Sequence, residues 1–176
     1  MGASPASSGG RGGRHLVGLI ADTHGRLDPA VFRLFAGVGL ILHAGDIGDE
    51  GVLAALALVA PVRAVMGNAD RGVLDERHPW HRVERVGTAR LLLLHQIGRP
   101  EAPDPAVRDL LRRVRPHAVC FGHTHRPYRA VHDGILFLNP GGAGPRRFGL
   151  PRSVARLTVT GEKLATEIFP LPEVGG

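Results

Sequence analysis

The sequence has a single cysteine, Cys120, among its 176 residues. No disulfide can form within the chain, which argues against a disulfide-stapled secreted fold, so we expect a reducing, cytoplasmic location. Cys120 lies in the apolar run AVCFG, and free cysteines in such runs are usually inert packing residues rather than nucleophiles.

Long apolar runs are also missing. The longest, VLAALALVAPV over residues 52–62, is too short to cross a bilayer, so no membrane partner is expected. Residues 1–14 are rich in glycine and serine and have no apolar core, which predicts a disordered tail rather than a signal peptide. We therefore expect a single domain over residues 15–170, followed by a short C-terminal tail over residues 171–176.

Lysine is nearly absent, since Lys163 stands alone among 22 basic residues, and aromatic residues make up only 5% of the chain. The net charge of +6 is carried by arginines scattered along the whole sequence. Scattered arginine without interleaved aromatics is weak evidence for a nucleic-acid groove. The charge is compatible with anionic substrates; nucleic acid as a partner is possible but unsupported.

Short β-branched and aliphatic runs alternate with helical patterns through the first part of the chain. Strands are predicted at residues 15–21, 40–45 and 62–67, with helices after Asp28 and over residues 50–59. A hairpin turning at Gly87-Thr88, a helix starting at Pro105 and a strand at residues 118–122 follow. Two further hairpins turn at Asp133-Gly134 and Gly161-Glu162. The order predicts an α/β fold in which two mixed β-sheets stack and helices flank them outside.

Five apolar strands end in residues that can bind a metal ion. These residues are Asp22 and His24, Asp46, Asn68, His95, and His123 and His125. Because ligands gather at the carboxyl ends of strands in α/β sheets, we expect these side chains to converge. The set has two carboxylates, one amide oxygen and four imidazoles but no thiolate, which suits Mn²⁺, Fe²⁺, Co²⁺, Ni²⁺ or Zn²⁺. Seven ligands fit two ions that share a carboxylate and keep open positions.

The ordered segments DTHG, GD, GNAD, a histidine after a leucine run, and GHTH resemble the calcineurin-like metallophosphoesterases. The short length and the segment NPGGAGPRRFGLPRSVARL are similar to the small bacterial and archaeal phosphodiesterase branch of that superfamily. The resemblance covers nearly everything except the N-terminal tail. It implies a four-layer α/β/β/α sandwich and two divalent transition-metal ions, with Mn²⁺ favoured.

The resemblance also implies roles for individual residues. One ion would be held by Asp22, His24, Asp46 and His125. The other would take Asp46, Asn68, His95 and His123, with Asp46 bridging the two. A metal-bridging hydroxide would then attack the phosphorus of a phosphoester.

Two positions depart from the family pattern. Ala69 stands where the wider superfamily has a histidine, the leaving-group acid, although the small branch also lacks that histidine. Gln96 stands where the family commonly has glycine, and it would be strained if the backbone there required a positive φ.

Three further residues are candidates for supporting or substrate-binding roles. Asp70 would orient a ligand rather than donate a proton, and His43 would support a neighbouring ligand from the core. Arg146 could clamp a phosphate, although a solvated basic loop explains it equally well.

The leading hypothesis is a dinuclear metal-dependent phosphodiesterase acting on a small-molecule or nucleotide-type phosphoester. A phosphomonoesterase or nuclease using the same centre is an alternative within enzymes. A non-catalytic scaffold of the same fold is the alternative from another class, and a homo-oligomer is possible.

Overall fold

The computed structural model describes residues 13–72 and 77–173 and contains two five-stranded sheets. The first sheet has the strand order β12-β11-β1-β2-β3. Strands β1, β2 and β3 run parallel to one another, and β11 and β12 add to the other side of β1 as an antiparallel hairpin. Its members are β1 (Arg14–Ile20), β2 (Leu40–His43), β3 (Val62–Ala64), β11 (Ser153–Thr160) and β12 (Lys163–Pro170).

The second sheet has the order β4-β5-β8-β10-β9, with a parallel centre and an antiparallel strand at each edge. Its members are β4 (His81–Val86), β5 (Ala89–Leu94), β8 (Ala118–Cys120), β9 (Tyr128–His132) and β10 (Ile135–Asn139). A two-stranded ribbon lies outside both sheets and consists of β6 (Gly98–Arg99) and β7 (Ala102–Pro103).

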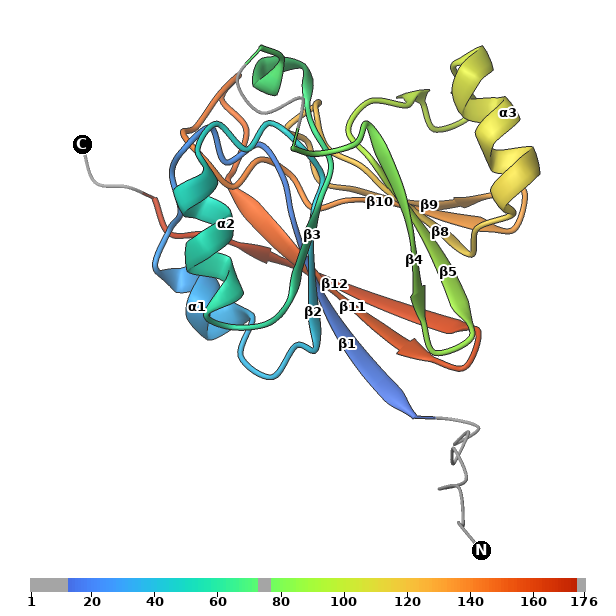
Figure 1. Cartoon of the computed structure of the whole chain (residues 1–176), viewed down its shortest axis with the longest axis horizontal. Coiled ribbons are helices and arrows are strands. Elements are labelled where there is room, and N and C mark those ends of the chain that lie inside the picture. The colour runs from blue at the N-terminus through green and yellow to red at the C-terminus, as the bar shows by residue number, and fades with distance from the viewer. Residues whose placement is uncertain (1–12, 73–76, 174–176) are drawn as a thin grey trace, which may run out of the picture.

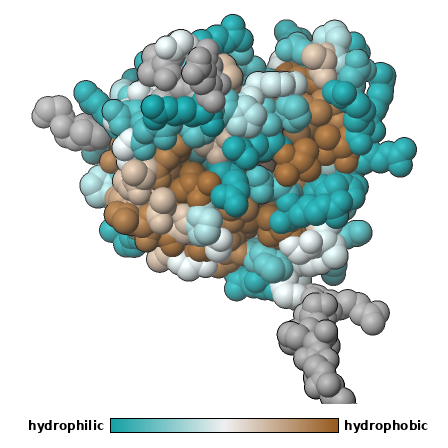
Figure 2. Space-filling model, viewed as in Figure 1, coloured by the Kyte–Doolittle hydropathy of each residue, from teal (hydrophilic) through white to brown (hydrophobic). Residues whose placement is uncertain are grey.

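Helices cover the outer face of each sheet. Helices α1 (Ala30–Leu34) and α2 (Glu50–Ala57) pack on the first sheet, and α3 (Pro105–Val114) packs on the second (Figure 1). A single 3₁₀ turn, η1 (Asn68–Asp70), follows β3. The same view in space-filling form shows hydrophobic patches on this face of both halves, bordered by hydrophilic residues (Figure 2). No helix of the described residues is long and apolar enough to cross a membrane.

Three apolar clusters separate the layers. The largest lies between the sheets and contains Leu19 and Leu157 of the first sheet and Leu91 and Cys120 of the second. A second cluster joins the first sheet to α1 and α2, and a third joins the second sheet to α3. Three apolar interfaces make four layers, so the predicted α/β/β/α sandwich is confirmed. Cys120 is fully buried, as expected from its apolar neighbours.

Most predicted elements occur where the sequence patterns place them, including all three hairpin turns. Helix α1 is shorter than its sequence pattern, which predicts Asp28 as the N-cap, Pro29 as the first helical residue and a stop near Gly37. Asp28 Oδ1 accepts the N–H of Ala30 at 2.9 Å, but the N-cap position is Pro29 and the helix ends at Leu34. Helix α2 ends at Ala57, two residues before the predicted end. The β6–β7 ribbon and η1 are too short to leave a periodic pattern.

The expected domain limits shift slightly at both ends. Arg14 already pairs with Thr160 in the first sheet, and Leu171, which we assigned to the C-terminal tail, is buried against the first sheet's helical face. Leu171 is held by its backbone N–H, which donates to Arg152 O at 2.8 Å. The remaining residues of the two expected tails, 1–12 and 174–176, lie outside the described residues.

Candidate metal centre

The seven predicted ligands lie in loops that follow β1, β2, β3, β5 and β8. Five of the seven have a positive φ, between 46° and 70°: Asp22, His24, Asp46, His123 and His125. Left-handed backbone costs a non-glycine residue of order 1 kcal/mol, and such strain collects at functional sites. The loop after β1 is held against the loop after β2 by backbone hydrogen bonds, including His24 N–H to Asp46 O at 3.0 Å.

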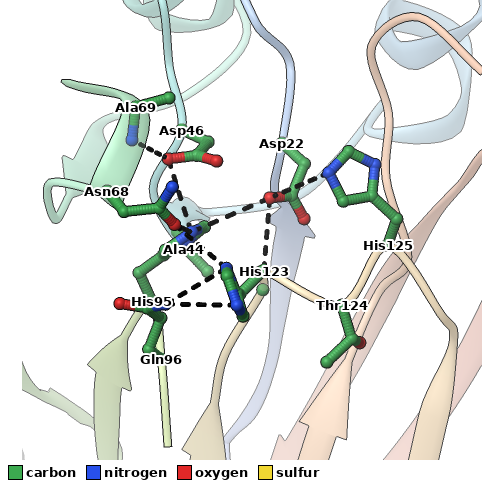
Figure 3. A network of polar contacts seen from close by, with 12 residues as sticks. Asp22, Ala44, Asp46, Asn68, Ala69, His95, Gln96, His123, Thr124 and His125 are labelled. Atoms are coloured by element: carbon green, nitrogen blue, oxygen red, sulfur yellow. Dashed lines mark hydrogen bonds and ion pairs between the residues drawn. The ribbon is translucent and has the colours of Figure 1, made fainter. Parts of the chain in front are cut away.

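All seven side chains form one continuous network. Figure 3 labels six of them, all except His24. One end contains Asp22, His24 and His125, whose candidate ligand atoms lie within 4.8 Å of one another. His125 Nε2 is 3.6 Å from Asp22 Oδ1 and 3.5 Å from His24 Nε2. The structure therefore brings these three together as a candidate ligand group.

The other end of the network contains His95, Asn68 and His123. The Oδ1 atom of Asn68 lies 3.1 Å from His95 Nε2 and 3.0 Å from His123 Nδ1. His95 Nε2 also lies 3.4 Å from Asp46 Oδ1. Asp46, His95 and Asp22 again have candidate ligand atoms within 4.8 Å of one another.

Both carboxylates lie between the two ends. The two oxygens of Asp46 face different sides, with Oδ2 3.8 Å from His24 Nε2 and Oδ1 3.4 Å from His95 Nε2. Asp22 belongs to both candidate groups, because Oδ1 is also 4.0 Å from His95 Nε2. A carboxylate in this position can bridge two cations.

The imidazoles at the first end are held neutral. Burial, together with the neighbouring His24 and Arg147, lowers the pKa of His125 to about 4. Burial and the charge of Arg147 also lower the pKa of His24. Neutral imidazole is the form that binds metal ions, so both rings are ready to coordinate at neutral pH.

In the Asp46–His95 pair, by contrast, each residue stabilises the charged form of the other. Burial would raise the pKa of Asp46, but the hydrogen bond and charge of His95, with the Ala69 N–H at 2.8 Å, lower it to about 2. Burial alone would lower the pKa of His95. The hydrogen bond and the negative charge of Asp46 have a larger, opposite effect, so the pKa of His95 is raised. His95 Nδ1 donates to Ala44 O at 2.7 Å, which fixes the ring and directs Nε2 into the centre.

Asp22 is the group that most needs a cation. It is fully buried, and its Oδ2 has no hydrogen-bond partner. Burial raises the pKa of this carboxyl to about 7, although His95 pulls it down. An unpaired buried carboxylate oxygen is costly, and a bound divalent ion would satisfy it. The described donor set therefore fits the transition-metal ions expected from the sequence.

Asp70 and His43 hold the loops that carry the ligands. Asp70 is fully buried and accepts N–H groups from Gly67 at 2.8 Å, Gly48 at 2.9 Å and Ile47 at 3.1 Å. Both oxygens are occupied by backbone donors, so Asp70 joins the loops after β2 and β3 and does not face a substrate.

His43 lies under the loop after β1. The Thr23 hydroxyl donates to Ile47 O at 2.9 Å, so it must accept from His43 Nε2, which is also 2.9 Å away. Burial lowers the pKa of His43 to about 3, so the ring is a neutral support for the segment between Asp22 and His24.

Arg146 is held by partners outside the seven-residue network, although it borders the same shallow depression as His125. It forms an ion pair with Glu173 at 3.0 Å and donates to Gly149 O at 3.2 Å. Arg152 is buried and pairs with Asp28 at 3.0 Å. Arg147 is the arginine whose charge reaches Asp22, His24 and His125. The sequence around Arg146, Arg147 and Arg152 contains no pattern that predicts which of these side chains is buried and which lies near the centre.

Asn139, at the end of β10, is a supporting residue that our sequence reasoning left without a role. Its buried amide donates to Gly122 O at 2.8 Å and to Thr124 Oγ1 at 3.1 Å, while its oxygen accepts Gly141 N–H at 2.9 Å. It therefore pins the loop that presents His123 and His125. The segment LNPGG, another polar residue after an apolar strand, was the available signal.

Two glycines allow the loops to approach closely. A Cβ on Gly67 would collide with the backbone and side chain of Asp46, and a Cβ on Gly122 would lie 2.9 Å from Ala21 Cβ. Gln96, by contrast, does not have a positive φ, so the strain considered for this position is absent. Its amide nitrogen lies 3.1 Å from His123 Nε2. Gln96 and His123 line a cavity of about 300 Å³ beside the centre, with Asp104 and Phe121.

Residues 16–162 match the calcineurin-like phosphoesterase superfamily domain. A protein of Methanothermobacter thermautotrophicus named "probable metallophosphoesterase" is 36% identical over 159 residues, covering 88% of this chain and 91% of the relative.

Two solved structures extend the likeness in fold. Vps29 of Chaetomium thermophilum superposes with a TM-score of 0.76 at 21% identity, covering 91% of this chain and 89% of that one. An archaeal phosphodiesterase superposes with a TM-score of 0.66 at 17% identity, covering 88% and 99%. With the domain match over most of its length and a relative above 30% identity, the chain belongs to the calcineurin-like phosphoesterase superfamily.

Proposed function

We propose that this protein is a dinuclear metal-dependent phosphodiesterase. The observation that carries the proposal is the single network of seven ligand-type side chains with the unpaired Oδ2 of Asp22 buried inside it. Asp22, His24, Asp46 and His125 would hold one ion. Asp46, Asn68, His95 and His123 would hold the other, and Asp46 would bridge because its two oxygens face the two ends.

The donor set favours a borderline transition metal, and we propose Mn²⁺, with Ni²⁺, Co²⁺, Fe²⁺ or Zn²⁺ as candidates of the same chemistry. When bound, two such ions supply a water of lowered pKa and stabilise charge on phosphoryl oxygens. Around them, His95 is held by Ala44 O, and Asp46 by the Ala69 N–H, so neither must reorganise during the reaction. Arg147 adds positive charge on the His125 side, which attracts an anionic phosphoester.

A diester is favoured over a monoester for two reasons. The cavity of about 300 Å³ beside Gln96 and His123 leaves room for an organic group on the second-ion side. One protein of the same fold is described as a phosphodiesterase. The partner would be a small or nucleotide-type phosphoester, and a cytoplasmic location remains our expectation from the single buried cysteine. A scaffold role is less favoured because no ligand position is lost.

Metal content and turnover test the proposal together. The protein is stripped of metal, reconstituted with Mn²⁺, and bound metal is counted per chain by mass spectrometry. We expect two ions, with faster hydrolysis of bis(p-nitrophenyl) phosphate than of p-nitrophenyl phosphate. Asp133→Asn serves as the control variant, because it removes a carboxylate in an exposed hairpin turn outside the seven-residue network. It should bind as much metal and hydrolyse the esters as fast as the native chain. Saturation at one ion, or faster monoester hydrolysis, would contradict the corresponding part of the proposal.

A further inference from the structure

Phe148 is an exposed aromatic residue at the edge of the metal centre. It is 78% exposed, whereas Phe35, Phe121 and Phe137 are buried. Leaving a phenylalanine side chain in water forgoes most of the free energy that its burial would supply. A large apolar side chain in this position therefore needs a reason other than packing.

The backbone at Phe148 is unusual as well. Phe148 and Gly149 have φ values of 54° and 67°, and Leu150 N–H donates to Arg147 O at 3.0 Å. Two central residues with positive φ define a turn that normally carries Asn-Gly or Asp-Gly. The chain contains that ordinary version at Asp133-Gly134, with φ values of 50° and 76°. Phenylalanine at the first central position is an outlier, and residues held against their preference are characteristic of ligand clamps.

Hydrogen bonds anchor the backbone on both sides of the turn. Arg152 is buried and donates to Gly144 O at 2.7 Å and to Ala143 O at 3.1 Å. Arg146 bonds to Gly149 O within the turn and to Glu173 outside it. The position of Phe148 is therefore set by the scaffold and not by contacts of its own side chain with a core.

The ring stands beside the first group of ligands. Its centroid is 5.7 Å from that of His125, with the two rings at 89°. The neighbouring Arg147 borders the same shallow surface depression as His125, together with Arg146. An aromatic surface and the neighbouring guanidinium group thus both belong to the His125 side of the centre, and neither lines the cavity at Gln96 and His123.

We propose that Phe148 is a stacking platform for a planar aromatic ring in the organic part of the substrate, while Arg147 faces the phosphate. The substrate class is then a phosphoester carrying an aromatic group near phosphorus, either an aryl group or a nucleobase. The inference rests on the proposed function, because it places the phosphate at the metal centre.

Binding of non-hydrolysable probes tests this without relying on turnover. Calorimetry on the Mn²⁺-reconstituted protein compares phenylphosphonate with methylphosphonate. It also compares the methylenephosphonate analogues of adenosine monophosphate and ribose 5-phosphate, in which a CH₂ group replaces the ester oxygen. Stacking on an exposed ring is worth roughly tenfold in affinity, so at least one aromatic member should bind about ten times more tightly. The first pair reports an aryl preference and the second a nucleobase preference.

Phe148→Asn removes the ring while placing a favoured residue in the turn. It should abolish the aromatic preference, leave methylphosphonate affinity unchanged and keep or raise the melting temperature. Phe148→Trp should retain the preference, and Arg147→Gln should weaken both members of a pair equally.

An unchanged aromatic preference in Phe148→Asn would overturn the inference, as would the absence of any preference in the native chain. A change of sedimentation coefficient in Phe148→Asn would also overturn it, since the ring would then cover a second copy. Retained aromatic preference with no hydrolysis of any phosphoester would overturn the proposed function alone. Hydrolysis without aromatic preference would overturn only the stacking role.

Discussion

The backbone N–H of His123 donates to the Oδ1 atom of Asp22 at 3.2 Å, across 101 residues of sequence. Asp22 follows β1 of the first sheet, and His123 follows β8 of the second (Figure 1). This bond joins the two sheets at the edge where all the ligand loops meet. The geometry of the centre therefore depends on how the two sheets stack. A substitution that shifts either sheet should change the positions of both groups of ligands.

Asp46 and Asp22 should differ in how many ions they hold. If Asp46 bridges, Asp46→Ala loses both ions and nearly all activity, while Asp22→Ala loses chiefly the ion held by His24 and His125. His123→Ala should spare that ion and weaken the other. Bound Mn²⁺ per chain, counted after dialysis, distinguishes these variants.

The same measurement can contradict the assignment. Asp22 also lies within reach of His95, at 4.0 Å, so it is the rival bridge. Loss of both ions in Asp22→Ala, with one ion kept in Asp46→Ala, would show that Asp22 bridges instead.

Metal binding should release protons at mildly acidic pH. Burial raises the pKa of Asp22 to about 7, and Asp46 outweighs burial to raise the pKa of His95, so both hold protons at pH 6 without metal. A cation must displace them, so metal affinity should increase as the pH rises from 6 through the pKa of Asp22 near 7. Calorimetry in two buffers of different ionisation enthalpy counts the protons.

Asp22→Asn isolates the carboxyl contribution. At pH 6 this variant should release about one proton fewer per chain than the native protein, and it should bind metal more weakly. Equal proton release by the two proteins would contradict the raised pKa of Asp22.

The residues that could be predicted are those with a local pattern. An apolar strand followed by Asp, Asn or His is visible in the sequence, and the carboxyl ends of parallel strands meet by geometry. The positions of Asp22 and Asp46 at one edge of the first sheet follow from that rule, as do those of His95 and His123 at one edge of the second. That the two edges lie together depends on how the sheets stack, which the rule does not predict. Hairpin turns such as Asp133-Gly134 were equally accessible, because their residue types match the turn conformation.

The residues that could not be predicted are those whose role depends on where the side chain points, which no local sequence pattern gives. Arg146, Arg147 and Arg152 look alike in the sequence, yet Arg146 pairs with Glu173, the charge of Arg147 lowers the pKa of His125, and Arg152 is buried. Phe148 lies between Arg147 and Arg152 in a turn with positive φ, and phenylalanine is not a residue type that predicts such a turn. Side chain–backbone bonds across long separations, such as Asn139 to Gly122, likewise leave no periodic signal.

His43 should make the metal-free protein sensitive to acid. Burial lowers its pKa from 6.5 to about 3. Between these two pH values, His43 is protonated in the unfolded chain and neutral in the folded chain. Stability is then complete above pH 6.5 and falls as pH decreases toward 3, by about 1.4 kcal/mol per pH unit. His43→Gln, which keeps an N–H donor for Thr23, should show a shallower decline of unfolding free energy in urea titrations.

A direct observation checks the same point. The ring protons of His43 should keep constant NMR chemical shifts between pH 8 and pH 4.5. A titration with a midpoint near 6.5 in the folded protein would contradict the buried neutral ring.

Ala69 predicts a steep dependence of rate on the leaving group. A poor leaving group needs a proton in the transition state, and a positioned general acid typically contributes about 10²–10⁴-fold. Ala69 cannot donate one from its side chain, and Asp70 has both oxygens occupied by backbone N–H groups. Nitrophenyl esters should therefore be hydrolysed far faster than alkyl esters by the Mn²⁺-loaded protein.

Introducing an acid should reduce that dependence. Residue 69 is exposed at the centre, and its N–H already contacts Asp46, so a longer side chain there has room beside the ligands. Ala69→His should raise kcat for alkyl esters preferentially and flatten a plot of log kcat against leaving-group pKa, whereas Ala69→Leu, similar in bulk, should not. A flat plot in the native protein would show that another group, with His24 the first to test, already supplies the proton.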